Sequence, residues 1–558
     1  MFNKRIRHIQ RYRDIVTVFS RNGLGYIAEE LGLYEMLSLP KKILIKEHQK
    51  INFKTLGERL RLILEELGPT FIKMGQIAST RPDIIPKDII HEFEKLQDNV
   101  PAFSIQEVKA IIEQEVGEID NIFIEFSEVP IAAASIGQVH YAVLKSGQPV
   151  AVKVQRPNIE NIIKTDLEIL KEIALLAESR LDWASRYKIL DIIEEFSNAL
   201  LAELDYSNEG RNAEKISKQF NNKKNIRIPT IYWEYSTKKV LMMEFIKGTK
   251  INEIEEIQQK GYNTKILAER IAQAIFHQIL IEGFYHGDPH PGNIAVLPDE
   301  IIVFMDFGMI GRLNPEMKTH FASLVISMMR QNTDGVIKAI TRMGLVPDEV
   351  NMQLLRTDID FIKDKYYDVS LSQVSLGEAI NELFSIANQH HIRIPSDLTL
   401  LAKTLLTIEG VVVKLDPDIS IINIAEPFGR QLLKDRYHPR KMAESIFNKW
   451  EEYGEIFTEL PKHIQEISSI MKSGKLPIEI NIPKVELLLT KLDRISNRLS
   501  FSIVLLSFSI IMVGLIIGSA LGGQSSLLWN IPAIEIGFGV AIFMFLWLLY
   551  SIFKSGRF

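Results

Sequence analysis

The sequence predicts an α+β fold in which a small antiparallel sheet lobe precedes a helical lobe. A helical extension is expected before the sheet and two membrane-spanning helices at the C-terminal end. Three observations support this prediction. Apolar residues follow a helical period over much of the chain. Short runs rich in Val, Ile and Phe alternate with turns between Ile122 and Val154. Two long uncharged segments lie near the C-terminus.

Length and composition exclude several classes of protein. A chain of 558 residues corresponds to about two to four folding units. Its 65 Lys and Arg residues against 70 Asp and Glu residues give a net charge of −5, which argues against a nucleic-acid-binding protein. Cysteine is absent, so disulfides, thiolate metal sites and cysteine nucleophiles are excluded. We expect six regions: a basic N-terminal helical region (1–60), a helical extension (61–125), the sheet lobe (126–246), the helical lobe (247–420), a helical linker (421–498) and a transmembrane hairpin (499–553).

The N-terminal region is basic and amphipathic. Five cations precede the first acidic residue, with Ile and Val between and after them. They are Lys4, Arg5, Arg7, Arg11 and Arg13. This pattern is typical of a helix lying on an anionic membrane surface, and equally of a basic helix packed on the protein itself. The sequence leaves both interpretations open.

Gly and Pro residues mark the boundaries of the segments that follow. Gly68-Pro69 ends one helix, and the spacing from Thr70 to Thr80 predicts the next. After the first strands, helix is expected at about 158–218. Strands are expected at Arg227 to Trp233 and Val240 to Phe245, and helix from Asn252 to Gly283.

The C-terminal apolar segments are long enough to cross a bilayer. Helices over 499–521 and 532–553 would be roughly 34 Å and 33 Å long, against about 30 Å of hydrocarbon. Basic residues flank both segments and the loop between them is neutral, which predicts that both termini and the soluble part are cytoplasmic. Gly514, Gly518 and Gly522 share one face, which allows close approach either of the two spans or of two copies of the protein as a homodimer. The alternative is a hairpin buried in a soluble core.

The first candidate motif is a loop of small residues ahead of a strand lysine. Ala132, Ala133, Ala134 and Ser135 precede Gly137 and Val139, and the next strand carries Lys153. A tight turn without bulky side chains lets backbone N–H groups approach nucleotide phosphates, which a following lysine can neutralise. In isolation the same pattern is an ordinary β-hairpin.

The second motif is an acidic helical segment containing Glu203, Asp205 and Glu209. An acid on a helix after the lysine strand can hold that lysine in place through an ion pair. Taken alone, such a segment is more often a solvated helix face.

The third and fourth motifs combine carboxylates with an amide. Asp288 and Asn293 lie on a proline-rich loop, and Asp306 follows an apolar strand directly before Phe-Gly. Phosphoryl transfer needs a carboxylate near the nucleophile and oxygen ligands for Mg²⁺, and these residues supply both. Zinc binding by His286 and His290 is the alternative, but Pro289 forbids the usual helical arrangement and cysteine is absent.

Together these motifs resemble the UbiB/AarF family of atypical kinases, the bacterial relatives of the COQ8/ADCK proteins. The resemblance covers roughly residues 60 to 420 and includes the Lys-x-Gly-Gln signature of the family at Lys73, Gly75 and Gln76. It implies a protein-kinase-like bilobal fold that binds ATP and Mg²⁺. The residues of the alanine-rich loop, Lys153 and Glu209 would bind the nucleotide, with Lys153 paired to Glu209. Asp288 would be the catalytic aspartate alongside Lys153, and Asn293 and Asp306 would bind the metal.

The resemblance also implies that the helix with Lys73 and Gln76 folds over the active site and contacts Glu203 and Asp205, which keeps protein substrates out. Gly287 replaces the usual arginine of the kinase catalytic loop, and the chain after Gly308 is too short for a full peptide-docking segment. The expected function is therefore a membrane-anchored ATPase or lipid-directed kinase that supports isoprenoid quinone biosynthesis of the ubiquinone type. Its expected partners are membrane lipids, quinone precursors and quinone-biosynthesis proteins at the bacterial cytoplasmic membrane, which the protein spans more than once.

Two other interpretations remain open. The protein could be a nucleotide-binding pseudo-enzyme that acts as a scaffold for a membrane biosynthetic complex. It could also be a small-molecule kinase similar to the aminoglycoside phosphotransferases, which share a His-Gly-Asp loop. The complete set of polar residues argues against the first, and the Lys-x-Gly-Gln helix argues against the second.

Overall fold

The computed structural model describes most of the first 436 residues. These are residues 2–436 apart from 32, 34–53, 80, 82–83, 97–100, 222, 331, 344–345, 347–349, 366–374, 391 and 393, with isolated positions between 499 and 547. The chain divides into two compact units, Met1–Ser445 and Ile446–Phe558. The first unit contains every predicted site residue.

Helices form the N-terminal part of this unit. They are α1 (Phe2–Arg21), α2 (Gly25–Glu30), α4 (Leu56–Leu67), α5 (Pro69–Ala78), α6 (Lys87–Phe93), α7 (Ile105–Glu115) and α8 (Ile119–Ile122). As predicted, Gly68 separates two helices. It adopts φ +94°, which glycine tolerates without strain, and Pro69 opens α5, where its missing N–H costs nothing.

The structure resolves the open question about the basic helix in favour of packing on the protein. In α1, the side chains of Tyr12, Ile15 and Val16 are buried in the main apolar core. Arg11 donates through Nε to the buried Asp166 of α9 at 2.6 Å. The residues that we considered for a membrane-facing surface therefore include several that face the protein.

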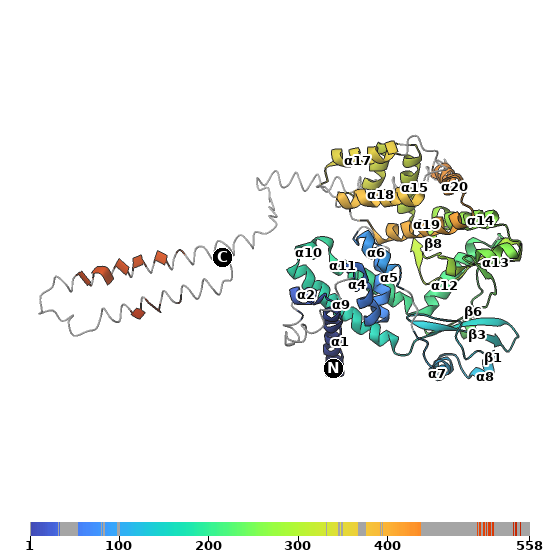
Figure 1. Ribbon diagram of the computed structural model, residues 1–558, viewed down its shortest axis with the longest axis horizontal. Coiled ribbons are helices and arrows are strands. Elements are labelled where there is room, and N and C mark those ends of the chain that lie inside the picture. Colours follow the sequence, from blue (N-terminus) through green and yellow to red (C-terminus); the bar gives the residue numbers. More distant parts are fainter. Residues whose placement is uncertain are drawn as a thin grey trace, which may run out of the picture. The chain divides into compact units, whose positions relative to one another are not determined.

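An antiparallel sheet with flanking helices forms the lobe at the lower right of Figure 1. Its strands are β1 (Phe123–Phe126), β2 (Ala132–Ala133), β3 (Gly137–Leu144), β4 (Pro149–Gln155) and β6 (Val240–Glu244). The order is β1-β3-β4-β6, with β2 pairing to β3. Alternate residues such as Val150, Val152 and Val154 are fully buried against α7. This alternation turns Lys153 toward the opposite face, where the next helices lie.

Four helices lie between β4 and β6 in the chain: α9 (Ile159–Arg180), α10 (Asp182–Tyr187), α11 (Ile189–Glu203) and α12 (Tyr206–Gln219). The prediction that Glu203, Asp205 and Glu209 lie on one helical segment is wrong. Glu203 ends α11, whereas Asp205 is the N-cap of α12 and accepts a hydrogen bond from the Ser207 N–H. An aspartate that caps a new helix favours a break over continued helix. The three acids consequently come from two helices.

The next part of the chain carries two small sheets. One has the order β5-β10-β9-β7 and the other pairs β11 with β8. Their strands are β5 (Ile226–Arg227), β7 (Thr249–Lys250), β8 (Phe284–His286), β9 (Ile294–Leu297), β10 (Ile301–Phe304) and β11 (Ile310–Arg312). The predicted strand at Arg227 to Trp233 is reduced to β5, followed by the 3₁₀ turn Trp233–Tyr235. The predicted helical stretch contains α13 (Ile254–Gln259), α14 (Thr264–Phe276) and the π-helical His277–Glu282.

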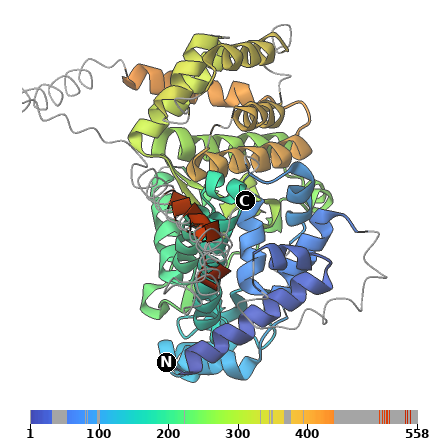
Figure 2. The same cartoon turned by 90° about the vertical axis from the view of Figure 1, so that its left-hand side faces the viewer.

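Six helices complete the described part of this unit. They are α15 (Pro315–Met329), α16 (Thr333–Arg342), α17 (Met352–Lys365), α18 (Leu376–Gln389), α19 (Ser396–Leu415) and α20 (Ile421–Arg436). Figure 2 shows them in yellow and orange at the top of the view, above the blue N-terminal helices. α19 packs on α14 and on β11, so it joins this group to the rest of the unit.

The predicted transmembrane hairpin falls largely outside the described residues. Isolated positions there, including Ile503, Ile510, Gly514 and Phe543, are helical, and the isoleucine and phenylalanine side chains are exposed. Gly518 and Gly522 of the glycine stripe are outside the described residues, as is most of the predicted linker after α20. Among the positions that the structure does describe, no helix is both long and apolar enough to cross a membrane.

Candidate active site

One cavity of about 960 Å³ brings most of the predicted site residues together. Its walls come from α5, α6, β4, α11, α12, the loops after β8 and β10, α18 and α19. The predicted residues that line it are Lys73, Gln76, Ala134, Lys153, Glu203, Asp205, Glu209, Asp288, Asn293 and Asp306. Residues more than 200 positions apart in the chain thus face a common space.

The predicted ion pair between strand and helix is present. Lys153 Nζ of β4 lies 2.7 Å from Glu209 Oε2 of α12, and both side chains are largely buried. Burial alone would lower the pKa of Lys153, but the carboxylates of Glu209 and Asp306 hold it well above the usual lysine value. The ammonium group therefore stays charged at neutral pH. It is held in a fixed position facing the cavity.

The loop that carries Asp288 is held by hydrogen bonds to the next strands. The buried His286 contacts the Met305 carbonyl through Nε2 at 2.9 Å, and its Nδ1 accepts from the Asp288 N–H at 3.2 Å. This pattern requires a neutral ring with the proton on Nε2. Burial lowers the pKa of His286, which favours the neutral form. The histidine therefore positions the loop, and the zinc alternative has no support from this arrangement.

Asn293 and Asp306 are oriented next to that loop. Asn293 donates through Nδ2 to the Asp288 carbonyl at 3.1 Å, so its Oδ1 is free of that bond and available as an acceptor. Asp306 has φ 58°, and its Oδ1 accepts from the Gly308 N–H at 3.2 Å. Aspartate and asparagine adopt this left-handed backbone more readily than most residues. The following residues turn the chain sharply into β11.

Asp306 is surrounded by protein yet open to the solvent of the cavity. Burial would raise its pKa, but attraction to Lys153 and then to Lys73 lowers the pKa to about 2. Its carboxylate is therefore ionised at any ordinary pH. In the described chain, no three His, Cys, Asp or Glu side chains are grouped as a metal site. One carboxylate and one amide still suit Mg²⁺, which takes few protein ligands and completes its shell with phosphates and water.

The small-residue loop contributes to the cavity only in part. Ala134 lines it, whereas Ala132 and Ala133 form the short strand β2. The Ser135 hydroxyl is completely buried and lacks a hydrogen-bond partner in the described structure, so a ligand oxygen could satisfy it. Gly137 and Val139 belong to β3.

Close packing gives a second reason for glycine at position 137. A Cβ there would lie 2.2 Å from Tyr206 Oη and 2.5 Å from the Val154 carbonyl oxygen. Tyr206 is itself buried, and its ring lies 5.2 Å from Lys153 Nζ. The glycine thus lets Tyr206 pack directly against β3, next to the lysine. A role for Gly137 in binding nucleotide stays a prediction.

Helix α5 lines the cavity through Lys73 and Gln76. Lys73 Nζ is 2.7 Å from Glu203 Oε1, and Gln76 Nε2 donates to the Leu96 carbonyl at 3.2 Å. Both interactions tie the helix to neighbouring walls of the cavity. Asp205 lines the cavity too, while its carboxylate caps α12.

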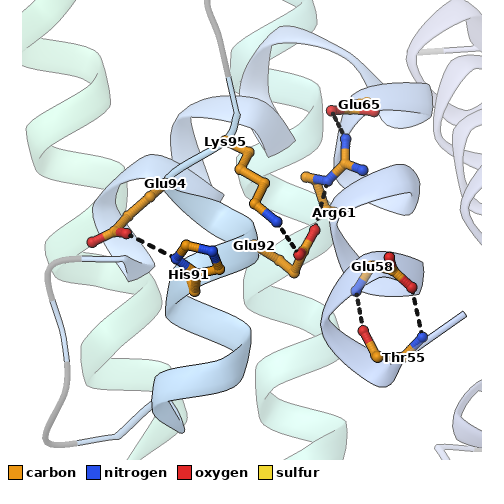
Figure 3. Close-up of polar contacts among 8 residues, drawn as sticks. All are labelled: Thr55, Glu58, Arg61, Glu65, His91, Glu92, Glu94 and Lys95. Carbon is orange, nitrogen blue, oxygen red and sulfur yellow. Dashed lines mark hydrogen bonds and ion pairs between the residues drawn. The ribbon is translucent and has the colours of Figure 1, made fainter.

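Figure 3 shows the polar contacts that hold α6, another wall of the cavity, against α4. Glu92 of α6 accepts from Arg61 Nε of α4 at 3.0 Å and also pairs with Lys95. The hydrogen bond from Lys95 is the largest influence lowering the pKa of Glu92. Arg61 also reaches Glu65 at 2.7 Å. These contacts fix α6 while His91 and Glu94 line the cavity.

Gly75 allows α5 to approach its neighbours, which leads to a prediction about stability. A Cβ at this position would lie 2.2 Å from Leu96 Cδ1 and 2.7 Å from Leu64 Cδ1. We expect Gly75→Ala to lower the free energy of unfolding by about 1 to 2 kcal/mol through overpacking. Chemical denaturation measures this change, and adding Leu96→Ala should recover part of the loss. A gain of about 1 kcal/mol, as for a solvent-facing helical glycine, would contradict this packing.

Lys403, a charged residue beside Asp288, was not among the predicted site residues. Lys403 of α19 lines the cavity, and its Nζ lies 3.3 Å from Asp288 Oδ1. The same helix holds the Asp288 loop, because Thr404 Oγ1 donates to the Gly287 carbonyl at 3.1 Å. A Cβ at Gly287 would lie 3.1 Å from the Met309 oxygen and 3.2 Å from Leu400 Cδ2. Glycine at position 287 therefore lets α19 pack against the loop.

Lys403 places a positive charge beside the proposed catalytic carboxylate. We expect Lys403→Met to reduce turnover of ATP by about 10²-fold while changing nucleotide affinity little, because a fixed charge acts mainly where charge develops in the reaction. Steady-state phosphate release and equilibrium nucleotide binding separate these effects. Lys403→Arg should restore part of the turnover. Lys414→Met, an exposed position on the same helix, is the matched control. Equal turnover in both methionine variants would exclude this role.

The sheet lobe, the helical lobe and the shared cavity with its lysine–glutamate pair define a kinase-like protein with a mixed α+β fold. Three family models match the chain: the ABC1 atypical kinase-like domain at residues 95–340, the UbiB helical domain at 359–420 and the ABC1/UbiB kinase-like C-terminal domain at 483–554. The chain belongs to the ABC1/UbiB atypical kinase family.

Similar proteins come from several organisms. An uncharacterized protein in the hydrogenase 1 5′ region of Clostridium pasteurianum is 32% identical, over 98% of this chain and 99% of its own. A probable protein kinase UbiB of Marinobacter nauticus is 34% identical, over 75% of this chain and 78% of its own. A solved structure described as the complex of Rv3197 with erythromycin, from Mycobacterium tuberculosis, has 22% identity and a TM-score of 0.46, over 65% of this chain and 93% of that one.

Proposed function

We propose that this protein binds Mg²⁺ and ATP in the 960 Å³ cavity and transfers the terminal phosphoryl group to water or to a small lipid-like molecule. The observation that carries the proposal is the meeting of the Lys153–Glu209 pair with Asp288 and Asp306 in one cavity. Each of these groups has a partner or a backbone conformation that fixes its direction. A scaffold that only bound nucleotide would not need Asp288 and Lys403 next to each other.

Each residue has a distinct role in this proposal. Lys153 neutralises the nucleotide phosphates, and Glu209 keeps the lysine in place. Asn293 and Asp306 would hold Mg²⁺, which supplies positive charge between the phosphates when bound. Asp288 orients the attacking hydroxyl or water and accepts its proton. The alanine-rich loop, with the unpartnered hydroxyl of Ser135, is proposed to lie against the phosphates.

The surroundings of the site favour a small acceptor over a peptide. Helix α5 is tied down by the pair of Lys73 and Glu203, and α19 covers the other side of the Asp288 loop. After Asp306 the chain enters β11 at Ile310 and α15 at Pro315. In a peptide-phosphorylating kinase this interval carries a longer segment on which the substrate docks.

The membrane setting and the pathway are part of the same proposal. We propose that residues 499–553 form a transmembrane hairpin that keeps the catalytic unit at the cytoplasmic side of a bacterial inner membrane, with a homodimer through its glycine stripe. The substrates would then be membrane lipids or isoprenoid quinone precursors of the ubiquinone type, handled together with quinone-biosynthesis proteins. The UbiB name of the Marinobacter nauticus relative agrees with this pathway.

The test is Mg²⁺-dependent phosphate release from ATP by the full-length protein, with and without anionic phospholipid vesicles. We expect release that requires Mg²⁺ and increases when vesicles are present. Asp299→Asn, which changes an exposed aspartate outside the cavity, should behave like the unmodified protein. Nucleotide binding without release under any condition would reject the enzymatic proposal and favour the scaffold alternative.

A further inference from the structure

An apolar cavity that is partly open lies among the helices after β11. A separate cluster of buried side chains lies among them: Val336, Met343, Leu355, Ile359, Phe384, Ala387, Ile392, Ile394 and Ala402. Every member of this cluster also lines a cavity of about 170 Å³. Protein cores are normally packed as densely as organic crystals, and an empty space in a core costs stability. A ligand that fills the cavity among these helices would therefore stabilise the fold.

The lining of this cavity determines what it can hold. All of its lining residues are Ala, Val, Leu, Ile, Met or Phe, from α15 to α19 and the segments between them. A buried water needs two to four polar partners, and an apolar cavity of about 150 Å³ stays dry and accepts benzene. This cavity is of similar size. It therefore suits a ring or a short stretch of hydrocarbon chain and excludes a nucleotide.

The apolar cavity adjoins the catalytic cavity. Phe384 of α18 lines both of them. On α19, Leu401 and Leu405 line the apolar cavity, whereas Lys403 and Thr407 line the catalytic one. Successive helical residues turn by about 100°, so one helix presents these two sets to different sides. The walls that separate a charged cavity from an apolar one are thus α18 and α19.

We propose that the apolar cavity binds the hydrocarbon end of an amphiphilic alcohol whose hydroxyl end reaches the catalytic cavity near Asp288 and Lys403. The ligand passes Phe384 where it extends from one cavity into the other. The placement of the hydroxyl end rests on the proposed function, whereas binding of the hydrocarbon end rests on the cavity alone. The ligand class is an alcohol with an apolar chain or ring.

Two methionine side chains allow each cavity to be observed separately. Met343 lines the apolar cavity and Met309 the catalytic one, among 16 methionines in the chain. The experiment uses the full-length protein with ¹³C-labelled methionine methyl groups, assigned through Met343→Leu and Met309→Leu. The probe is 1-octanol, with ethanol as the matched alcohol that lacks a chain. We expect a saturable shift of the Met343 methyl signal with 1-octanol and none with ethanol.

Variants that fill the cavity provide the control. Ala402→Leu and Ala387→Leu, on different helices, add volume to the cavity. In each, the response of Met343 to 1-octanol should be lost. Thermal unfolding checks that at least one of them remains folded, and 1-octanol should raise the unfolding temperature of the unmodified protein only. An unchanged Met343 response in a folded, filled variant, or no saturable response in the unmodified protein, would overturn the proposal.

Phosphate release measured on the same samples distinguishes the proposed enzymatic function from the proposed apolar binding site. If Met343 responds to 1-octanol but ATP is never turned over, the apolar binding site stands and the enzymatic function fails. If ATP is turned over while Met343 does not respond, the function stands and this inference fails. A response of Met309 to 1-octanol but not to ethanol would support a hydroxyl end in the catalytic cavity.

Discussion

Asp288→Asn is expected to reduce ATP turnover by about 10³-fold while leaving nucleotide affinity nearly unchanged. The substitution keeps the size of the side chain but removes the group that accepts a proton, and a positioned general base typically contributes between about 10² and 10⁴ in rate. Affinity should persist because the phosphates are held by Lys153 and by the proposed metal ligands. Mg²⁺-dependent phosphate release and equilibrium binding of ATP measure the two quantities on one preparation.

Asp299→Asn is the matched control, because it makes the same chemical change at an exposed turn outside the cavity. Its turnover should equal that of the unmodified protein. Full turnover in Asp288→Asn would show that the carboxylate is not the base, and a parallel loss of binding would show that Asp288 acts on the nucleotide itself.

Asp306→Asn is expected to abolish the dependence of nucleotide binding on Mg²⁺. The carboxylate is the charged group proposed to hold the metal, and an amide is a far weaker ligand for a hard divalent cation. Backbone strain should not alter the measured Mg²⁺ dependence, because asparagine adopts the φ of 58° found at this position. Asp299 has φ 63°, so Asp299→Asn controls for the backbone as well as for the chemistry. ATP affinity measured over a Mg²⁺ titration would contradict the role if both variants kept the same Mg²⁺ dependence.

The pKa of about 2 at Asp306 sets the pH range for that comparison. A depressed pKa means that the folded protein favours the ionised carboxylate, so its attraction to Lys153 and Lys73 is fully present above the usual aspartate value of 3.8. The attraction is lost as the pH falls from that value toward about 2. Between about pH 5 and 8, titration of Asp306 should therefore not change Mg²⁺ affinity in the unmodified protein.

Local sequence was sufficient for the parts of the site that short segments build. The loop from His286 to Asn293 and the turn at Asp306 need only their own prolines, glycines and strands, so the sequence predicts both. Gly68-Pro69 likewise marks a helix boundary through backbone geometry alone. The break between α11 and α12 was missed because Asp205 can be either a helical acid or an N-cap, and spacing does not distinguish them.

Lys403 was missed because nothing near it in the chain signals an active site. It lies on an amphipathic helix more than 100 residues after Asp288, and only the packing of Thr404 and Leu400 on the Asp288 loop brings its charge to the cavity. The packing role of Gly137 was not predicted for a similar reason. A kinase-like loop motif accounts for that glycine, yet the close contact is with Tyr206, nearly 70 residues away.

The sequence by itself thus determined the order of the lobes, the chemical groups of the site and the membership of the family that they indicate. These features depend on hydrophobic period, turn residues and short motifs, which act over a few neighbouring residues. Only the tertiary structure decided that Lys403 faces Asp288 and that an apolar cavity lies beside Phe384. Distances between side chains and the volume left among packed helices are set by contacts between distant segments. No local pattern specifies them.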